Sequence, residues 1–135
     1  MPVAHLRSFA TEVLKECSAH GELCISFVGE KTIARLNRQY LHRRGTTDVI
    51  SFSMDSPGEE VLGQTLIGDV VICVPRAAQD AKEEGVSLRH KLEILVLHGI
   101  LHLMGYDHEN GNDLKKMKAK ENRIWNALRK KTAKK

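Results

Sequence analysis

The stretch from residue 88 to residue 104 limits the fold more than any other part of the sequence. It is apolar almost all round, and its pattern predicts a helix that Ser87 caps and Gly105 ends. Its most apolar part, residues 92–104, is too short to span a membrane and carries two histidines. A helix that is apolar on every side must be covered by other elements, so we expect it at the centre of a globular domain.

The pattern around this helix predicts an α+β fold. Helical spacing of apolar residues covers 4–17, 31–41, 75–84 and 113–130, whereas strand-forming runs cover 23–28, 48–54 and 66–74. This order predicts a small mixed β-sheet of three to four strands covered by helices. A chain of 135 residues has room for one core, and we expect a single domain over 1–131 with a basic tail at 132–135.

Charge is distributed unevenly along the chain. From Lys115 to the C-terminus there are ten Lys or Arg residues and one acid, Glu121, while the rest of the chain is net acidic. A basic end of this kind indicates a polyanionic partner, although a solvated tail has the same composition. Aromatic residues make up only 4% of the chain, which argues against a base-stacking sheet.

Cysteine usage indicates a reducing compartment. Cys17, Cys24 and Cys73 form neither a CxxC pair nor an even-numbered disulfide framework. The N-terminus has no apolar stretch of the kind that secretion signals carry. We therefore expect a cytoplasmic protein with no membrane contact.

Three histidines carry the strongest functional signal. His98 and His102 are four residues apart, so on a helix they share one face and can bind one metal ion. Gly105 can then turn the chain back and bring His108 to the same ion. The spacing is that of the extended zincin pattern and predicts a zincin-like metal-site helix. Three neutral ligands leave a fourth position for water, which suits zinc, nickel or another divalent metal.

One residue separates this pattern from the zinc peptidases. Those enzymes have a glutamate general base directly after the first histidine, whereas this chain has Gly99. Phosphodiester cleavage instead requires an activated nucleophile and cations that hold the phosphate. The segment 31–44 contains five Lys or Arg residues and no acid, which suits a phosphate but is equally typical of a solvated helix face.

Three motifs together resemble a known family. The segments H98-G-I-L-H102-L-M-G-Y-D-H108, T47-D-V-I-S-F52 and G68-D-V-V-I72 resemble the YbeY family of bacterial and organellar endoribonucleases, the rRNA maturation factors. The resemblance implies a single-domain α+β fold with a mixed sheet of about four strands, and one zinc-type ion at the three histidines. It also implies single-strand-specific cleavage of RNA, a role in 16S rRNA 3′-end processing and ribosome quality control, and ribosomal proteins and a ribosome-associated GTPase as partners.

The sequence departs from the family pattern at one position. An arginine that assists catalysis in the family usually follows the tyrosine before T-D-V-x-S-F, but here Leu41 follows Tyr40. Arg43 and Arg44, slightly downstream, are our candidates for the catalytic guanidinium, since arginine binds phosphate with two parallel hydrogen bonds.

Carboxylates near the motifs are further candidates. Asp48, Asp69 and Asp107 could each orient a ligand imidazole from outside the metal's own ligand set. The nucleophile stays open between water at the metal and the substrate's own 2′-OH.

Two other functions also fit the residues. One is a metallopeptidase or other metallohydrolase that uses Asp107 or Glu109 as its base. The other is a non-catalytic ribosome-assembly factor that binds RNA and holds a structural metal.

Overall fold

A computed structural model describes residues 3–19, 21–42, 45–53, 60–61, 64–105 and 111–133. Within these residues the chain forms helices and strands in the order α1 (Val3–Glu16), β1 (Glu22–Val28), α2 (Glu30–Leu41), β2 (Val49–Ser53), β3 (Glu60–Val61), β4 (Gln64–Cys73), α3 (Val74–Glu84), α4 (Leu88–Leu103) and α5 (Gly111–Ala133).

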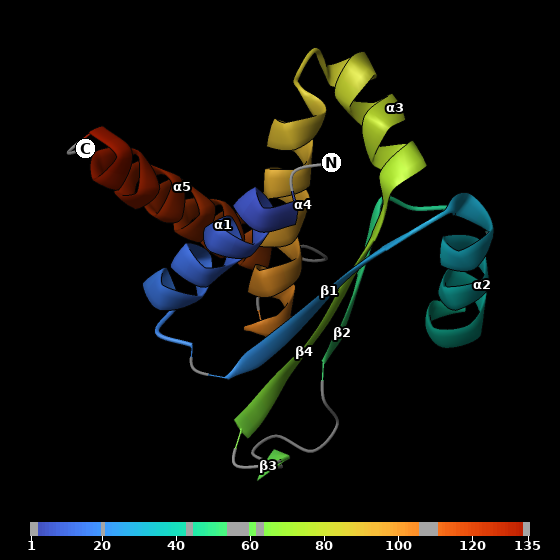
Figure 1. Ribbon diagram of the computed structural model, residues 1–135, viewed down its shortest axis with the longest axis horizontal. Helices are drawn as coiled ribbons and strands as arrows, with labels where there is room; N and C mark the ends of the chain where they lie inside the picture. Colours follow the sequence, from blue (N-terminus) through green and yellow to red (C-terminus); the bar gives the residue numbers. More distant parts are fainter. Residues whose placement is uncertain are drawn as a thin grey trace.

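Strand β4 is the centre of a small mixed sheet (Figure 1). It pairs with β1 in parallel, with Ile25 opposite Val70, and with β2 antiparallel, with Ile50 opposite Val71. The short strand β3 pairs antiparallel with the first residues of β4. The predicted α+β fold with a small mixed sheet is therefore confirmed.

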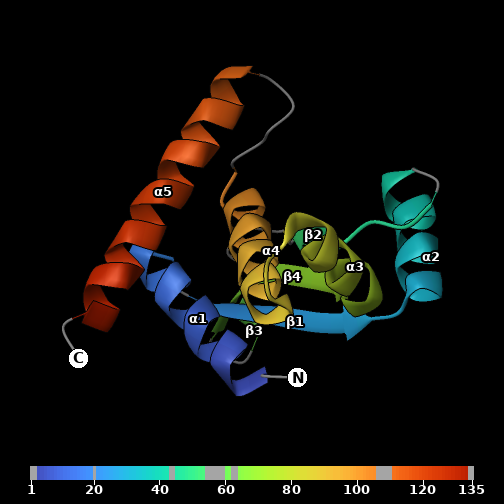
Figure 2. The same ribbon diagram turned by 90° about the horizontal axis from the view of Figure 1, so that it is seen from above.

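Alternation along β4 divides the core between the two faces of the sheet. Val70 and Ile72 belong to the main cluster, which includes the buried faces of α1, α4 and α5, whereas Val71 and Cys73 pack with Ile33 of α2. Figure 1 shows α1, α4 and α5 on one side of the sheet and α2 on the other. Figure 2, viewed from above, shows α5 lying alongside α1, away from α2.

Local chemistry accounts for where the helices begin and end. Ser87 caps α4 by accepting a hydrogen bond of 3.0 Å from the His90 N–H. Pro75 lies in the first turn of α3, where its missing N–H costs nothing. Gly105 has φ +98° and ends α4, as predicted. The predicted helices and longer strands are confirmed, while β3 was not predicted and α5 extends to Ala133, into the stretch expected to be a tail.

Helix α4 approaches the sheet unusually closely at Gly99. A β-carbon built at Gly99 would lie 2.7 Å and 2.8 Å from the two γ-methyls of Val70 and 3.1 Å from Ser51 Oγ. The Ser51 hydroxyl donates a hydrogen bond of 3.2 Å to the Gly99 carbonyl. Any side chain at this position would therefore push the helix away from β2 and β4.

We expect Gly99→Ala to destabilise the protein. Overpacking costs about 1–3 kcal/mol, and here it outweighs the gain of roughly 1 kcal/mol in helix propensity, because the two methyls of Val70 lie in a fully buried core. Urea unfolding should show a net loss of up to about 2 kcal/mol in the free energy of unfolding.

The double variant Gly99→Ala/Val70→Ala tests the cause. Val70→Ala alone leaves a cavity, but combined with Gly99→Ala it should cost less, because the new methyl occupies the space that valine vacates. Strict additivity of the two single effects would contradict the steric explanation.

Candidate metal centre

His98 and His102 lie together on one face of α4. Their ring centroids are 6.1 Å apart and the ring planes meet at 31°. Both residues are partly exposed, in contrast to the fully buried Val96 and Ile100 on the same helix. The expected co-facial pair is therefore present, at the border between the core and solvent.

The donor chemistry of this pair fits a transition metal. Two imidazoles that share a tetrahedral zinc at ordinary bond lengths have ring centroids about 5 Å apart, which is close to the separation of this pair. The third predicted ligand, His108, lies outside the described residues. Among residues 3–105 and 111–133, as far as they are described, no three His, Cys, Asp or Glu side chains are grouped closely enough to hold an ion.

Glu121 places a carboxylate next to the histidine pair, which the sequence alone did not predict. Its Oε1 lies 3.1 Å from Nε2 of His98, which links α5 to α4. A carboxylate that accepts the N–H of a ligand histidine fixes the ring and makes the other nitrogen a better ligand. Because Glu121 is 23 residues after His98 and on another helix, only the tertiary packing reveals this pairing.

The same face of α5 also carries a cation. Lys118 precedes Glu121 by three residues, so the two side chains leave the helix on neighbouring positions, and Lys118 is exposed. An exposed ammonium one helical turn from Glu121 can bind the phosphate of a substrate.

Gly99 faces the sheet and not the histidine side of α4. A glutamate base of the zinc-peptidase kind would have to occupy the space of Val70 and Ser51. The departure from the peptidase pattern is thus a packing requirement of this fold as well as the loss of a functional group.

The segment that holds the candidate arginines is described only in part. Arg43 and Arg44 lie outside the described residues. Before them, the Tyr40 ring lies edge-on to Phe52 of β2, with ring centroids 5.4 Å apart. Ser51, which precedes Phe52 in β2, donates a hydrogen bond to the Gly99 carbonyl of α4. The C-terminal end of α2 and the helix that carries the histidines therefore both adjoin β2.

Asp48, which directly precedes β2, lies beside the first turn of α4 and is too far from His98 to orient its ring. Its Oδ2 is 3.9 Å from Nζ of the buried Lys91, which also contacts the Glu84 carboxylate at 2.9 Å. Lys91 precedes His98 by two helical turns, about 10 Å. Burial raises the pKa of Asp48, with Lys91 opposing and a hydrogen bond to Asp80 reinforcing the rise.

Of the other two candidate carboxylates, Asp69 is among the described residues and Asp107 is not. Asp69 alternates with Val70 and so lies on the α2 side of the sheet, where its carboxylate contacts Cys24, away from the metal helix. The suggestion that Asp69 orients a ligand imidazole is therefore wrong. Asp107 lies outside the described residues.

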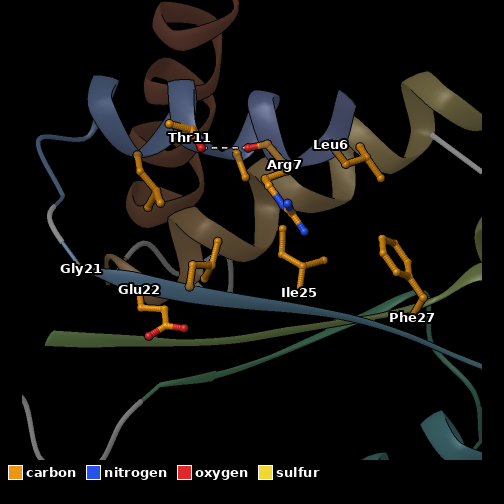
Figure 3. A pocket seen from close by; sticks show the side chains of 10 residues that line it. Leu6, Arg7, Thr11, Gly21, Glu22, Ile25 and Phe27 are labelled. Carbon is orange, nitrogen blue, oxygen red and sulfur yellow. Dashed lines mark hydrogen bonds between the residues drawn. The ribbon is translucent and has the colours of Figure 1, made fainter. Parts of the chain in front are cut away.

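A cavity of about 370 Å³ lies elsewhere, between α1 and β1 (Figure 3). Leu6, Arg7 and Thr11 of α1 face Ile25 and Phe27 of β1 across it. None of the predicted site residues lines this cavity, so it is separate from the histidine pair.

Fold and histidine pair together define a small α+β protein with a candidate metal-binding helix. The model of a family described as Endoribonuclease YbeY matches residues 2–129. The chain therefore belongs to the YbeY family of endoribonucleases.

Individual relatives agree with this assignment. The chain is 40% identical over 126 residues to an Endoribonuclease YbeY of Geobacter metallireducens, with 91% of this chain and 84% of the relative covered. It is also 40% identical over 121 residues to an Endoribonuclease YbeY of Pseudomonas putida, covering 90% and 76% of the two chains. The solution structure of TM1509 from Thermotoga maritima matches with a TM-score of 0.58 at 26% identity, covering 98% of this chain and 87% of that one.

The lengths and compositions of the described helices also bear on membrane insertion. None of these helices combines the length and the apolar character that crossing a bilayer requires.

The stability contributed by Asp48 should depend on pH in a defined direction. Because burial raises its pKa above the ordinary 3.8, the folded protein holds this proton more tightly than the unfolded chain does. Ionised Asp48 therefore costs stability above its folded pKa, and the cost disappears as the pH falls below 3.8.

Asp48→Asn provides the matched comparison, since asparagine does not ionise. Urea unfolding at neutral pH and at about pH 3.5 should show the variant gaining on the wild type as the pH rises through this window. A difference that stays constant with pH would show that Asp48 titrates alike in the folded and unfolded states.

Proposed function

We propose that this chain is a single-strand-specific, metal-dependent endoribonuclease that acts in rRNA maturation, including 16S rRNA 3′-end processing, and in ribosome quality control. Membership of the YbeY family over residues 2–129 supports the activity. The structural observation that carries the proposal is the partly exposed His98–His102 pair, with Glu121 against one ring. The catalytic unit is the domain 1–131, with 132–135 as its basic C-terminal end.

The proposed metal site comprises His98, His102 and His108, with one Zn²⁺ ion as the preferred occupant and nickel or another divalent metal as alternatives. When bound there, the ion would lower the pKa of a coordinated water and neutralise charge on the phosphate. Glu121 would hold the His98 ring in orientation, and Lys118 would hold a phosphate oxygen. Arg43 and Arg44 are the proposed catalytic guanidiniums that stabilise charge on the phosphorane-like transition state.

The proposed substrate is ribosomal RNA, and the proposed partners are ribosomal proteins and a ribosome-associated GTPase in the cytoplasm. Exposed lysines on α5 support an RNA partner, because Lys115, Lys116 and Lys118 occupy its first half, which leads into the Glu121 contact with His98. No observation favours a metallopeptidase, since the position of the usual base faces the sheet.

His102→Ala should abolish both stoichiometric metal binding and RNA cleavage while leaving the fold intact. The residue is partly exposed at the end of α4, so its loss removes a ligand and little core packing. Metal content by mass spectrometry, circular dichroism and cleavage of a single-stranded RNA are measured on the same preparation, which also exposes any contaminating nuclease.

Glu121→Gln is the graded control for the metal site. It keeps the shape of the side chain but weakens the contact with His98, so metal affinity should fall by about 10- to 100-fold without being lost. If His102→Ala instead unfolds the protein, a structural metal in a non-catalytic assembly factor becomes the better explanation. Full cleavage by metal-free His102→Ala would refute the proposed site.

The double variant Arg43→Ala/Arg44→Ala should reduce RNA cleavage by roughly 10²- to 10³-fold, as loss of a group that stabilises transition-state charge does. Metal content should stay at the wild-type level, because neither residue is a ligand. Unchanged cleavage would remove both arginines from the mechanism.

End-group analysis of the products separates the two possible nucleophiles, a water molecule and the substrate's own 2′-OH, since attack by the 2′-OH leaves a cyclic phosphate.

A further inference from the structure

Helix α2 carries a stripe of cations on the side that faces away from the sheet. Lys31, Arg35 and Arg38 follow one another at spacings of four and three residues, which places them within an arc of about 60° on the helix. All three are exposed, and the buried Ile33 lies on the opposite side. We call these three residues the α2 stripe.

The cations of the α2 stripe have no carboxylate partner among the described residues. Some cations elsewhere in the described chain do pair with acids on their own helix, as Arg76 does with Asp80 at 3.2 Å and Lys15 with Glu12 at 3.6 Å. Within the stripe, the neighbours at three and four residues are other cations. Such like-charged pairs destabilise a helix unless an external anion neutralises them.

The position of the α2 stripe makes it distinct from the candidate metal centre. Ile33 and Leu36 pack α2 against one face of the sheet, while α4 covers the other (Figure 1). Lys118, one helical turn before Glu121, belongs to α5 on that second side. A ligand that contacts both the stripe and the histidines must therefore pass around the sheet.

We infer that the α2 stripe is a second RNA-binding surface, which holds the phosphate backbone of a long RNA at a distance from the scissile bond. The inference rests on the proposed function. An RNA strand presents regularly spaced phosphates, and three cations along about 10 Å of helix offer matching charges. The C-terminal end of α2 adjoins β2, which also contacts α4, so one strand can pass from the stripe around the β2 edge towards the histidines. The stripe thus favours long or structured RNA over short oligonucleotides.

The test compares two variants with the same change in net charge. Lys31→Gln/Arg35→Gln/Arg38→Gln removes the stripe, whereas Lys15→Gln/Lys82→Gln/Arg89→Gln removes three exposed cations from α1, α3 and α4. All substituted positions are exposed and glutamine is a good helix former, so both proteins should fold, which circular dichroism verifies.

Fluorescence anisotropy measures the affinity of the metal-loaded proteins for a long 2′-O-methyl RNA between about 50 and 200 mM salt. The stripe variant should lower the slope of log affinity against log salt by about 2, the value for three contacts to a single strand. The control variant should retain the wild-type slope. Cleavage assays should show a raised KM for long unmodified RNA and unchanged kcat for a trinucleotide.

Each outcome separates this inference from the proposed function. A wild-type slope in the stripe variant overturns the second surface, even if all proteins cleave RNA. An equal loss of slope in both variants also overturns it, because total charge would then explain binding. If polyglutamate displaced RNA from the stripe as effectively as unlabelled RNA does, an acidic protein would be the better partner. A reduced slope together with no cleavage by the wild type would support the surface and reject the nuclease.

Discussion

The contact of α4 with the sheet at Gly99 determines how the candidate metal centre is presented. Because the helix has no side chain there, it lies directly on Val70 and Ser51, and this fixes its rotation about its own axis. His98 is rotated by about 100° from Gly99, and His102 lies within about 40° of His98. Both imidazoles therefore lie on a flank of the helix, where α5 can reach them and solvent can enter.

Helix α5 completes this arrangement because it returns antiparallel along α4. Trp125 of α5 contacts His90 near the start of α4, with ring centroids 5.5 Å apart, while Glu121 contacts His98 further along. The positive φ at Gly105, where α4 ends, allows the chain to reverse. The helix that carries most of the basic C-terminal charge is thus held beside the histidines by packing, and not only by sequence proximity.

Most of the fold could be predicted because the apolar pattern of each helix matches the face that it buries. Ser87 and Gly105 also marked the ends of α4. The pattern could not show that Lys91 is buried in this apolar helix, since its partners Glu84 and Asp48 come from other elements. Nor could it show that Gly99 is a packing residue, because Val70 and Ser51 are distant in sequence. For the candidate site, the four-residue spacing was sufficient to predict that His98 and His102 share one face of α4. The contact between Glu121 and His98 could not be predicted, because it depends on how α5 packs against α4.

The distribution of ion pairs determines where the unpaired cations of the surface lie, although it leaves the formal charge of +4 unchanged. Carboxylates of the acidic part of the chain are engaged internally, such as Glu84 with Lys91 and Asp80 with Arg76. Each such pair removes one cation and one anion from the field that a distant ligand experiences. The exposed cations that stay without a described carboxylate partner on α2 then act on a polyanion as a separate group, on the opposite side of the sheet from α4. Net charge alone would not distinguish this arrangement from an evenly basic surface, but the salt dependence of two charge-matched variants would.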